Sequence, residues 1–282
     1  MQGPSRAGTA DDAILGVAPR VVYTPSTQAE AAEVLRLCAS KRMAVAFAGG
    51  RTDIGLGAPP RRVDAVVETS LLDRIVEYAP ADMVLIAEGG TTLAAVQAAA
   101  AKEGQRLSLD PPLPVRATVG GIVAANSFGP RRARYGSARD VIIGVGIIRA
   151  DGTPARGGGK VVKNVAGFDL PKLACGSLGT LGMLGTLSFR LHPFPEASAT
   201  LLVRGRSASQ IVALLAEVVK AQLEPTSSVA LCEGDAAQFD LAVRFEGFAA
   251  GVSQQAQRLA LVCRGGGTSA ELLDDVSARS TW

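Results

Sequence analysis

Three glycine-rich segments of this 282-residue sequence carry the residue types that could bind a phosphate-bearing ligand. They occupy residues 48–57 (AGGRTDIGLG), 117–140 (ATVGGIVAANSFGPRRARYGSARD) and 176–183 (GSLGTLGM). Glycine permits turns in which successive backbone N–H groups point into one concavity, and such a nest binds phosphate oxygens without a lysine. No G-K-[ST] follows the first segment, so it is not a Walker A loop. A plain turn between two strands is the alternative interpretation.

The second segment opens with Thr118-Val-Gly-Gly and continues through small residues to Asn126. Small residues allow backbone and cofactor to approach closely, and the N–H groups at a helix start favour anionic oxygens. Tight helix–sheet packing through glycine and alanine is the alternative. Further along the segment, Arg139 and Asp140 either serve the cofactor or pair with each other in a structural role.

Charge and composition argue against nucleic-acid binding. The net charge is only +3, and 48% of the residues are hydrophobic, as in an ordinary globular protein. We therefore interpret Arg131, Arg132 and Arg134 as a solvated loop face or a surface that docks a partner.

Cysteine and histidine usage excludes several kinds of catalytic site. The four cysteines are far apart and form no C-x-x-C pair, so we expect neither zinc nor an iron–sulfur cluster in this chain. His192 is the single histidine, and we interpret it as a surface or hinge residue rather than a general base. No G-x-S-x-G nucleophile motif is present. The sequence identifies no catalytic residue and no metal ligand.

Targeting signals are not evident. The first residues lack a basic stretch followed by an apolar one, and the apolar run 141–148 is too short to span a bilayer. We expect a cytoplasmic protein with reduced thiols and no transmembrane segment. Peripheral association with a membrane through a partner stays open.

The pattern of elements predicts two domains. Short strands and helices alternate through residues 1–195, with a helix expected from a capping box at Thr27 to about Arg42. Residues 196–282 follow the order β-α-β-β-α, the split βαβ pattern of ferredoxin-like domains without its last strand. We therefore expect an incomplete second domain, in a chain shorter than its relatives or completed by a partner.

The three glycine-rich segments, in this order, resemble the FAD-binding domain of the vanillyl-alcohol-oxidase/p-cresol-methylhydroxylase (PCMH-type) family. The resemblance covers about residues 19–193 and implies an α+β fold of two subdomains. Within that family, V-K-N-V-A-G-F-D-L followed by G-S-L-G-T-L-G is most similar to the FAD-binding subunits of glycolate oxidases. The related 2-hydroxyacid dehydrogenases usually carry G-S-E-G-T-L-G, and Leu178 stands at the position of that glutamate.

The resemblance implies which residues bind FAD. Along the diphosphate it places Ala48, Gly49, Gly50, Arg51, Thr52 and Asp53. The further cofactor-binding candidates are Pro111, Thr118, Gly120, Gly121, Asn126, Gly129, Gly136, Arg139, Asp140, Val145, Gly182 and Met183. Family members with covalent flavin often carry a histidine in or near the first loop, and none is present here, so we expect non-covalent FAD.

The function implied is a flavin subunit that takes part in the oxidation of glycolate to glyoxylate. Its partners would be a second flavin subunit and an iron–sulfur subunit, and its substrate a small 2-hydroxy acid. Two alternatives stay open: a self-contained FAD-dependent 2-hydroxyacid dehydrogenase and a non-catalytic scaffold subunit.

Overall fold

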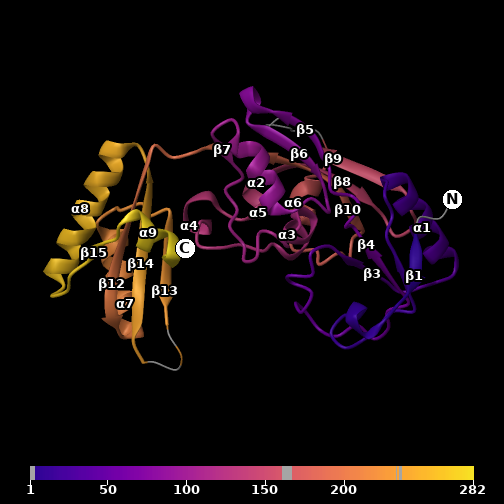
Figure 1. Ribbon diagram of the computed structural model, residues 1–282, viewed down its shortest axis with the longest axis horizontal. Helices are drawn as coiled ribbons and strands as arrows, with labels where there is room; N and C mark the ends of the chain where they lie inside the picture. Colours follow the sequence, from indigo (N-terminus) through magenta and orange to yellow (C-terminus); the bar gives the residue numbers. More distant parts are fainter. Residues whose placement is uncertain (1–3, 161–166, 233, 235–236) are drawn as a thin grey trace. The chain divides into compact units, whose positions relative to one another are not determined.

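A computed structural model describes residues 4–160, 167–232, 234 and 237–282 (Figure 1). The chain divides into two compact units, which we call unit 1 (Met1–Gly129 and Ser137–Pro193) and unit 2 (Pro130–Gly136 and Phe194–Trp282). The sequence predicted two contiguous domains divided at residue 195. In the structure the division is not contiguous, because unit 2 also includes Pro130–Gly136. The arginine-rich loop belongs to unit 2, because Arg131 and Arg134 form ion pairs there with Glu246 and Glu224.

The first part of unit 1 is a four-stranded sheet in the order β1-β2-β4-β3. Its strands are β1 (Ser5–Ala7), β2 (Val21–Tyr23), β3 (Val45–Ala48) and β4 (Ala65–Glu68), and both β2 and β3 run parallel to β4. Helix α1 (Gln28–Ser40) begins as predicted, since the Thr27 hydroxyl accepts a hydrogen bond from the Glu30 N–H at 3.1 Å. Its apolar side, with Val34, Leu35 and Cys38, is buried in the core beside this sheet.

The second part of unit 1 is an antiparallel sheet in the order β5-β6-β10-β8-β9. Its strands are β5 (Ile75–Ala79), β6 (Val84–Glu88), β8 (Ile142–Ile148), β9 (Pro154–Gly158) and β10 (Met183–Arg190). Helices α2 (Leu93–Ala101), α3 (Val119–Ala125), α5 (Ala138–Val141) and α6 (Leu170–Ala174) contribute to the same core (Figure 1). The short elements are η1 (Ala10–Asp12), η2 (Pro80–Asp82), β7 (Gln105–Arg106) and β11 (His192–Pro193).

Unit 2 is a sheet in the order β13-β14-β12-β15. Its elements are α4 (Arg132–Tyr135), β12 (Ala197–Arg206), α7 (Ala208–Lys220), β13 (Ser227–Leu231), β14 (Phe239–Gly247), α8 (Ala249–Gly265), β15 (Glu271–Leu272) and α9 (Asp275–Thr281). The expectation of a missing last strand is wrong, because β15 pairs antiparallel with β12 through Leu201↔Leu272 and Leu202↔Glu271. The sheet order of the split βαβ pattern is thus complete, although its last strand has only two residues.

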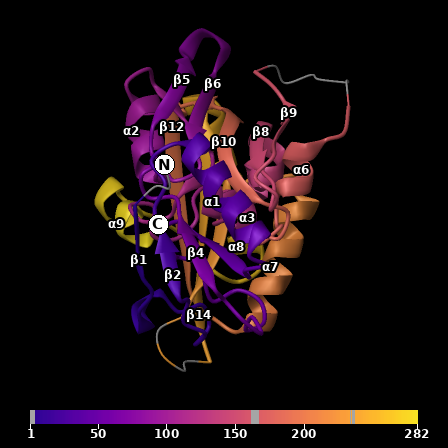
Figure 2. The same cartoon turned by 90° about the vertical axis from the view of Figure 1, so that its right-hand side faces the viewer.

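The sheet of unit 2 is covered on both faces. Leu201, Val203 and Phe245 lie in the core that α7 and α8 complete. On the other face, the indole N–H of Trp282 donates to the Thr200 hydroxyl at 3.1 Å, and the Arg244 guanidinium lies 5.7 Å from the indole centroid. Figure 2 shows α9 on one side of β12 and β14, with α7 and α8 on the other.

Replacing Leu187 by alanine tests the core of unit 1. Leu187 is completely buried on the central strand β10, opposite Ala87 of β6 and Val145 of β8. We expect Leu187→Ala to lower the free energy of unfolding by about 2–5 kcal/mol, because it removes buried methyl groups and leaves a cavity. Urea unfolding followed by circular dichroism measures this. The control, Val76→Ala at an exposed position of β5, should change stability by less than about 0.5 kcal/mol. Equal effects of the two variants would contradict the placement of Leu187.

Candidate cofactor site

A cleft in unit 1 brings the three glycine-rich segments together. Its empty volume, counted together with the part open to solvent, is about 1140 Å³. The predicted site residues that line it are Ala48, Gly49, Gly50, Arg51, Thr52, Asp53, Thr118, Gly120, Gly121, Gly182 and Met183. They come from the end of β3, the start of α3 and the start of β10.

The loop after β3 presents its backbone to this cleft. Within the described residues, the N–H groups of Gly50, Arg51, Thr52 and Asp53 donate no hydrogen bond to the protein. Arg51 has the left-handed backbone conformation, with φ +56°. Successive N–H groups beside a left-handed residue form the nest that binds anions. The structure therefore supports an anion site at this loop.

The sequence predicted that the N–H groups at the start of α3 would bind anionic oxygens, but in the structure they have protein partners. The Gly120 N–H donates to the Gly89 carbonyl at 2.8 Å, and the Val119 N–H donates to the Thr91 carbonyl at 2.9 Å. The Thr118 hydroxyl, which caps the helix, accepts from the Gly121 N–H at 3.3 Å. Because these donors already have protein partners, the expected anion binding by the helix start is not supported. This segment contributes a wall of the cleft.

Close backbone packing explains the glycines at the base of the cleft. A β-carbon on Gly50 would lie 1.7 Å from the Arg116 carbonyl oxygen, and one on Gly120 would lie 2.6 Å from the Gly89 carbonyl oxygen. Gly89 in turn would clash with the Leu184 carbonyl at 2.1 Å. The tight packing that the sequence offered as the alternative interpretation is therefore present, and it assembles the cleft.

Seven predicted residues do not line the cleft: Pro111, Asn126, Gly129, Gly136, Arg139, Asp140 and Val145. Val145 is buried in the core on β8, and Gly129 packs on the backbone of Asp110, whose oxygen a β-carbon would approach to 2.0 Å. Asn126 ends α3 in the left-handed conformation, and its Oδ1 is buried without a hydrogen-bond partner.

The remaining predictions near α5 have local structural explanations. Gly136 belongs to unit 2 and ends α4. Asp140 accepts from the Ser137 N–H at 2.8 Å and completes the capping box of α5. The structure gives no ion pair between Arg139 and Asp140, two described residues, so the suggested pairing is not supported. Both side chains are exposed, and neither reaches the cleft.

Fourteen described residues of the cleft were not among the predicted cofactor-binding residues, although half of them lie within the three glycine-rich segments. They are Ile14, Val45, Ala46, Phe47, Ile54, Leu56, Thr69, Gly89, Ala124, Ala125, Leu178, Gly179, Thr180 and Leu184. The Gly89-Gly90 pair directly after β6 is the one sequence signal that was available for Gly89. Ile14 carries no such signal, because it reaches the cleft from the loosely patterned N-terminal segment. Residues 162–166 of the V-K-N-V-A-G-F-D-L motif lie outside the described residues.

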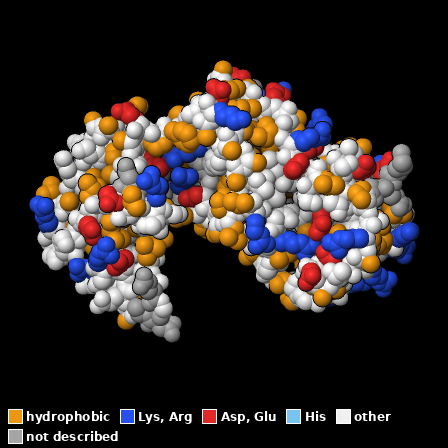
Figure 3. All heavy atoms as spheres, in the orientation of Figure 1, with side chains coloured by type: hydrophobic (Ala, Val, Ile, Leu, Met, Phe, Trp, Pro, Cys, Tyr) orange, Lys and Arg blue, Asp and Glu red, His pale blue; other side chains and the backbone are white. Residues whose placement is uncertain are grey.

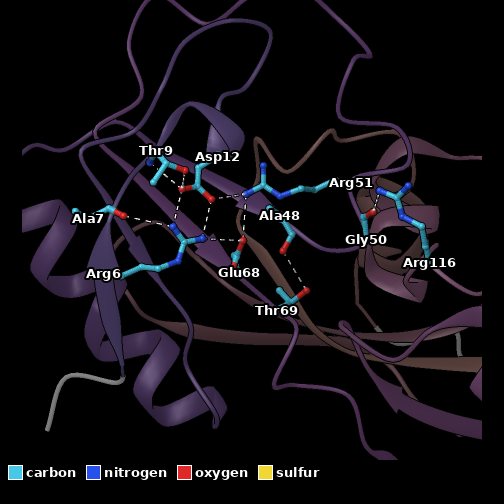
Figure 4. Close-up of polar contacts among 10 residues, drawn as sticks. All are labelled: Arg6, Ala7, Thr9, Asp12, Ala48, Gly50, Arg51, Glu68, Thr69 and Arg116. Atoms are coloured by element: carbon cyan, nitrogen blue, oxygen red, sulfur yellow. Dashed lines mark hydrogen bonds and ion pairs between the residues drawn. The ribbon is translucent and has the colours of Figure 1, made fainter.

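The side chain of Arg51 is engaged with carboxylates. Its Nη2 lies 3.1 Å from Glu68 Oε1 and 3.6 Å from Asp12 Oδ1 (Figure 4). Asp12 also accepts two hydrogen bonds from the Arg6 guanidinium, at 2.6 and 2.7 Å. The Arg6 hydrogen bonds hold the pKa of the Asp12 carboxyl far below its ordinary value of 3.8. Their contribution to stability is therefore present above pH 3.8 and is lost as the pH falls further.

His192 does not line the cleft and is not suited to act as a base. It lies on β11, whose partner is β7. Burial, and then the charges of Arg190 and Arg106, lower the pKa of His192 to about 4. Because this pKa lies well below the ordinary value of 6.5, the imidazole is neutral at pH 7 but is a weak proton acceptor.

No helix of the described residues is long and apolar enough to cross a membrane, and these residues contain no group of three or more His, Cys, Asp or Glu side chains arranged to hold a metal ion. On the face shown in Figure 3, basic and acidic side chains of unit 1 lie interspersed. This distribution agrees with the small net charge of +3.

Residues 19–158 match the family described as "FAD binding domain". The fold and the site together define a PCMH-type FAD-binding fold, and the family match covers 140 of the 282 residues. The predictions of this fold class and of FAD as the cofactor are confirmed.

Curated relatives include subunits of one enzyme. Glycolate oxidase subunit GlcE of Escherichia coli is 41% identical over 174 residues, covering 61% of this chain and 48% of the relative. Glycolate oxidase subunit GlcD of Bacillus subtilis is 29% identical over 209 residues, covering 74% and 44%. D-lactate dehydrogenase of Archaeoglobus fulgidus is 35% identical over 196 residues, covering 67% and 44%. The chain thus spans about half the length of these relatives.

Solved structures share the fold. An alkyldihydroxyacetonephosphate synthase superposes with a TM-score of 0.77 at 17% identity, covering 90% of this chain and 52% of that one. Substrate-bound p-cresol methylhydroxylase gives 0.74 at 15% identity, covering 93% and 59%. The residues of the cleft fit FAD: the unpartnered N–H groups after β3 suit a diphosphate, and the backbone-lined walls leave room for its extended parts.

Two alanine substitutions in the first loop test the cleft. Gly50→Ala should weaken FAD binding by roughly tenfold or more, because its β-carbon would displace the loop from the Arg116 backbone. Gly55→Ala is the matched control, since nothing lies within 4 Å of its β-carbon position. FAD titration followed by flavin fluorescence measures both affinities. A loss of affinity of the same size in Gly55→Ala would contradict the special role of Gly50.

The titration of His192 is a second test. As the single histidine, it gives one imidazole Cε1–H signal in a proton NMR spectrum. We expect this signal of the folded protein to titrate with a midpoint near pH 4. Because the unfolded chain takes up the proton near pH 6.5, the free energy of unfolding should fall as the pH drops from 6.5 to about 4. A midpoint near 6.5 would show that the imidazole is not buried as described.

Proposed function

We propose that this chain is the FAD-binding subunit of an enzyme that oxidises glycolate, or a closely similar 2-hydroxy acid, to the 2-oxo acid. The observation that carries the proposal is its 41% identity to glycolate oxidase subunit GlcE over 174 residues. Leu178 supports this choice within the family. It lies at the cleft in G-S-L-G-T-L-G, where the related dehydrogenases usually have glutamate.

The role of the chain is to hold the cofactor. The N–H groups after β3 would bind the diphosphate, and Thr118, Gly120 and Gly182 would form the walls around it. With FAD bound, the site gains a group able to accept a hydride equivalent from a 2-hydroxy acid. The described residues of the cleft include no His, Cys or Tyr side chain to which flavin could be linked, which supports non-covalent binding.

The described cleft offers one carboxylate, Asp53, and no histidine, lysine or glutamate that could act as a catalytic base. Among its described residues, only Arg51 and Asp53 carry charge, and Arg51 is paired with Asp12 and Glu68. This chain spans about half the length of its relatives, so a base could be supplied by residues beyond this cleft. We therefore propose that turnover requires partners: a second flavin subunit and an iron–sulfur subunit. Cytoplasmic location, with membrane association only through those partners, belongs to the same proposal.

A self-contained 2-hydroxyacid dehydrogenase is the second candidate. It is favoured by the 35% identity to D-lactate dehydrogenase of Archaeoglobus fulgidus over 196 residues. A scaffold subunit without flavin is disfavoured by the N–H groups that stand ready for a diphosphate.

Anaerobic reduction by glycolate separates these functions. We expect the purified chain to show a flavin spectrum that glycolate leaves unchanged, and that bleaches once the partner subunits are added. Denaturation should release the flavin into solution, because it is not covalently attached. Bleaching of the chain alone would favour the self-contained dehydrogenase, and a colourless chain that still binds its partners would favour the scaffold.

A further inference from the structure

The loop after β3 contains a non-glycine residue, Arg51, in a left-handed backbone conformation that glycine adopts with less strain. Arg51 adopts φ +56°, a region that side chains with a β-carbon rarely occupy. Its neighbours Gly49 and Gly50 show that glycine is available in this loop. Something other than local preference must therefore hold Arg51 in this conformation.

The side chain of Arg51 supplies that hold. Only 21% of it is exposed, and its Nη2 reaches both Glu68, at 3.1 Å, and Asp12, at 3.6 Å. Glu68 ends β4 and stands opposite Ala48, the last residue of β3. The guanidinium thus folds back from the loop onto the neighbouring strand, which fixes the backbone from which it extends.

Asp12 is itself held rigidly. Its side chain is 5% exposed, and it accepts hydrogen bonds from the Arg6 guanidinium and from the N–H and hydroxyl of Thr9. Arg6 lies 3.9 Å from Glu68 as well, so two arginines and two carboxylates form one ion cluster: Arg6, Asp12, Arg51 and Glu68 (Figure 4). Charged pairs that are buried and share partners are strongly coupled.

We propose that this ion cluster positions the anion-binding loop, and that Asp12 is a positioning residue for FAD although it does not line the cleft. By fixing Arg51 in the left-handed conformation, the cluster directs the N–H groups of residues 50–53 toward one anion. The N-terminal segment then has two roles, since Ile14, two residues after Asp12, forms part of the cleft wall. The proposal depends on FAD binding alone and not on the substrate.

The sign of the effect distinguishes positioning from simpler electrostatics. Asp12 is negative, so a purely long-range effect would make Asp12→Asn bind the anionic diphosphate more tightly. If the cluster merely kept Arg51 away from the diphosphate, releasing that arginine would also tighten binding. Positioning predicts the opposite, a weaker complex.

The experiment measures the FAD dissociation constant by flavin fluorescence in the full chain stripped of flavin. We expect Asp12→Asn to raise it by about tenfold relative to the unmodified chain. Asp151→Asn is the matched control, because Asp151 also pairs with an arginine (Arg149, 2.6 Å) and with a backbone N–H, but lies at the β8–β9 turn. The control should stay within about twofold.

A double-mutant cycle tests whether Asp12 acts through Arg51. Arg51→Gly allows the left-handed conformation and removes the guanidinium, so Asp12→Asn should have no further effect on FAD affinity in that background. If Asp12→Asn prevents folding, Glu68→Gln serves in its place, because it leaves the Arg6–Asp12 pair intact. It should also weaken FAD binding. An unchanged or lower dissociation constant in the folded Asp12 or Glu68 variant overturns the proposal. So does an equal effect of Asp12→Asn with and without Arg51.

Discussion

Contact of backbone with backbone is the constraint on which the cofactor site depends. Gly50 lies on the Arg116 carbonyl, Gly120 on Gly89, and Gly89 on the Leu184 carbonyl, in each case closer than a β-carbon permits. These contacts join the loop after β3, the start of α3 and the start of β10, which are far apart in sequence. Because side chains are absent from the contacts, the remaining polar groups of the backbone can face a ligand. The hydrogen-bond pattern then decides which do so: α3 donates its first N–H groups to the carbonyls of Thr91 and Gly89, whereas those of residues 50–53 stay available.

A site built in this way needs its polar groups held in place from outside. The walls are mostly glycine, alanine and aliphatic residues, and the charged Arg51 points its guanidinium at Asp12 and Glu68. The affinity for an anion must therefore come from the direction of backbone dipoles rather than from a free cation. The affinity for an anion then depends on the backbone conformation of Arg51. It depends also on the N-terminal segment, which contributes Asp12 although it has few regular elements of its own.

Much of this could be predicted from the sequence, for physical reasons that differ between residues. The glycine-rich segments indicated a site for a phosphate-bearing ligand because close approach and nests require glycine, whereas the fold and FAD were implied by the resemblance of their order to the PCMH-type family. Arg139, Asp140 and Val145 stay untested as cofactor contacts, and they do not line the cleft because sequence proximity to a motif does not determine direction: Asp140 caps α5, and Val145 is buried in the core. Ile14 and the Arg6–Asp12 pair were missed because their role arises from tertiary contacts with Glu68 and Arg51. The strand β15 was missed because two residues carry no detectable alternation.

The same geometry separates cofactor binding, which the cleft provides, from proton abstraction, which needs a reactive side chain. A cleft that binds its cofactor through backbone groups can omit reactive side chains, and the described cleft residues include neither histidine, lysine nor glutamate. The single histidine lies on β11, with its pKa lowered to about 4 by burial and by two arginines, so it offers little basicity. Abstraction of a proton from a 2-hydroxy acid requires a group with a pKa nearer to the working pH. Under the proposed function, a base other than Asp53 would therefore have to come from outside the described cleft.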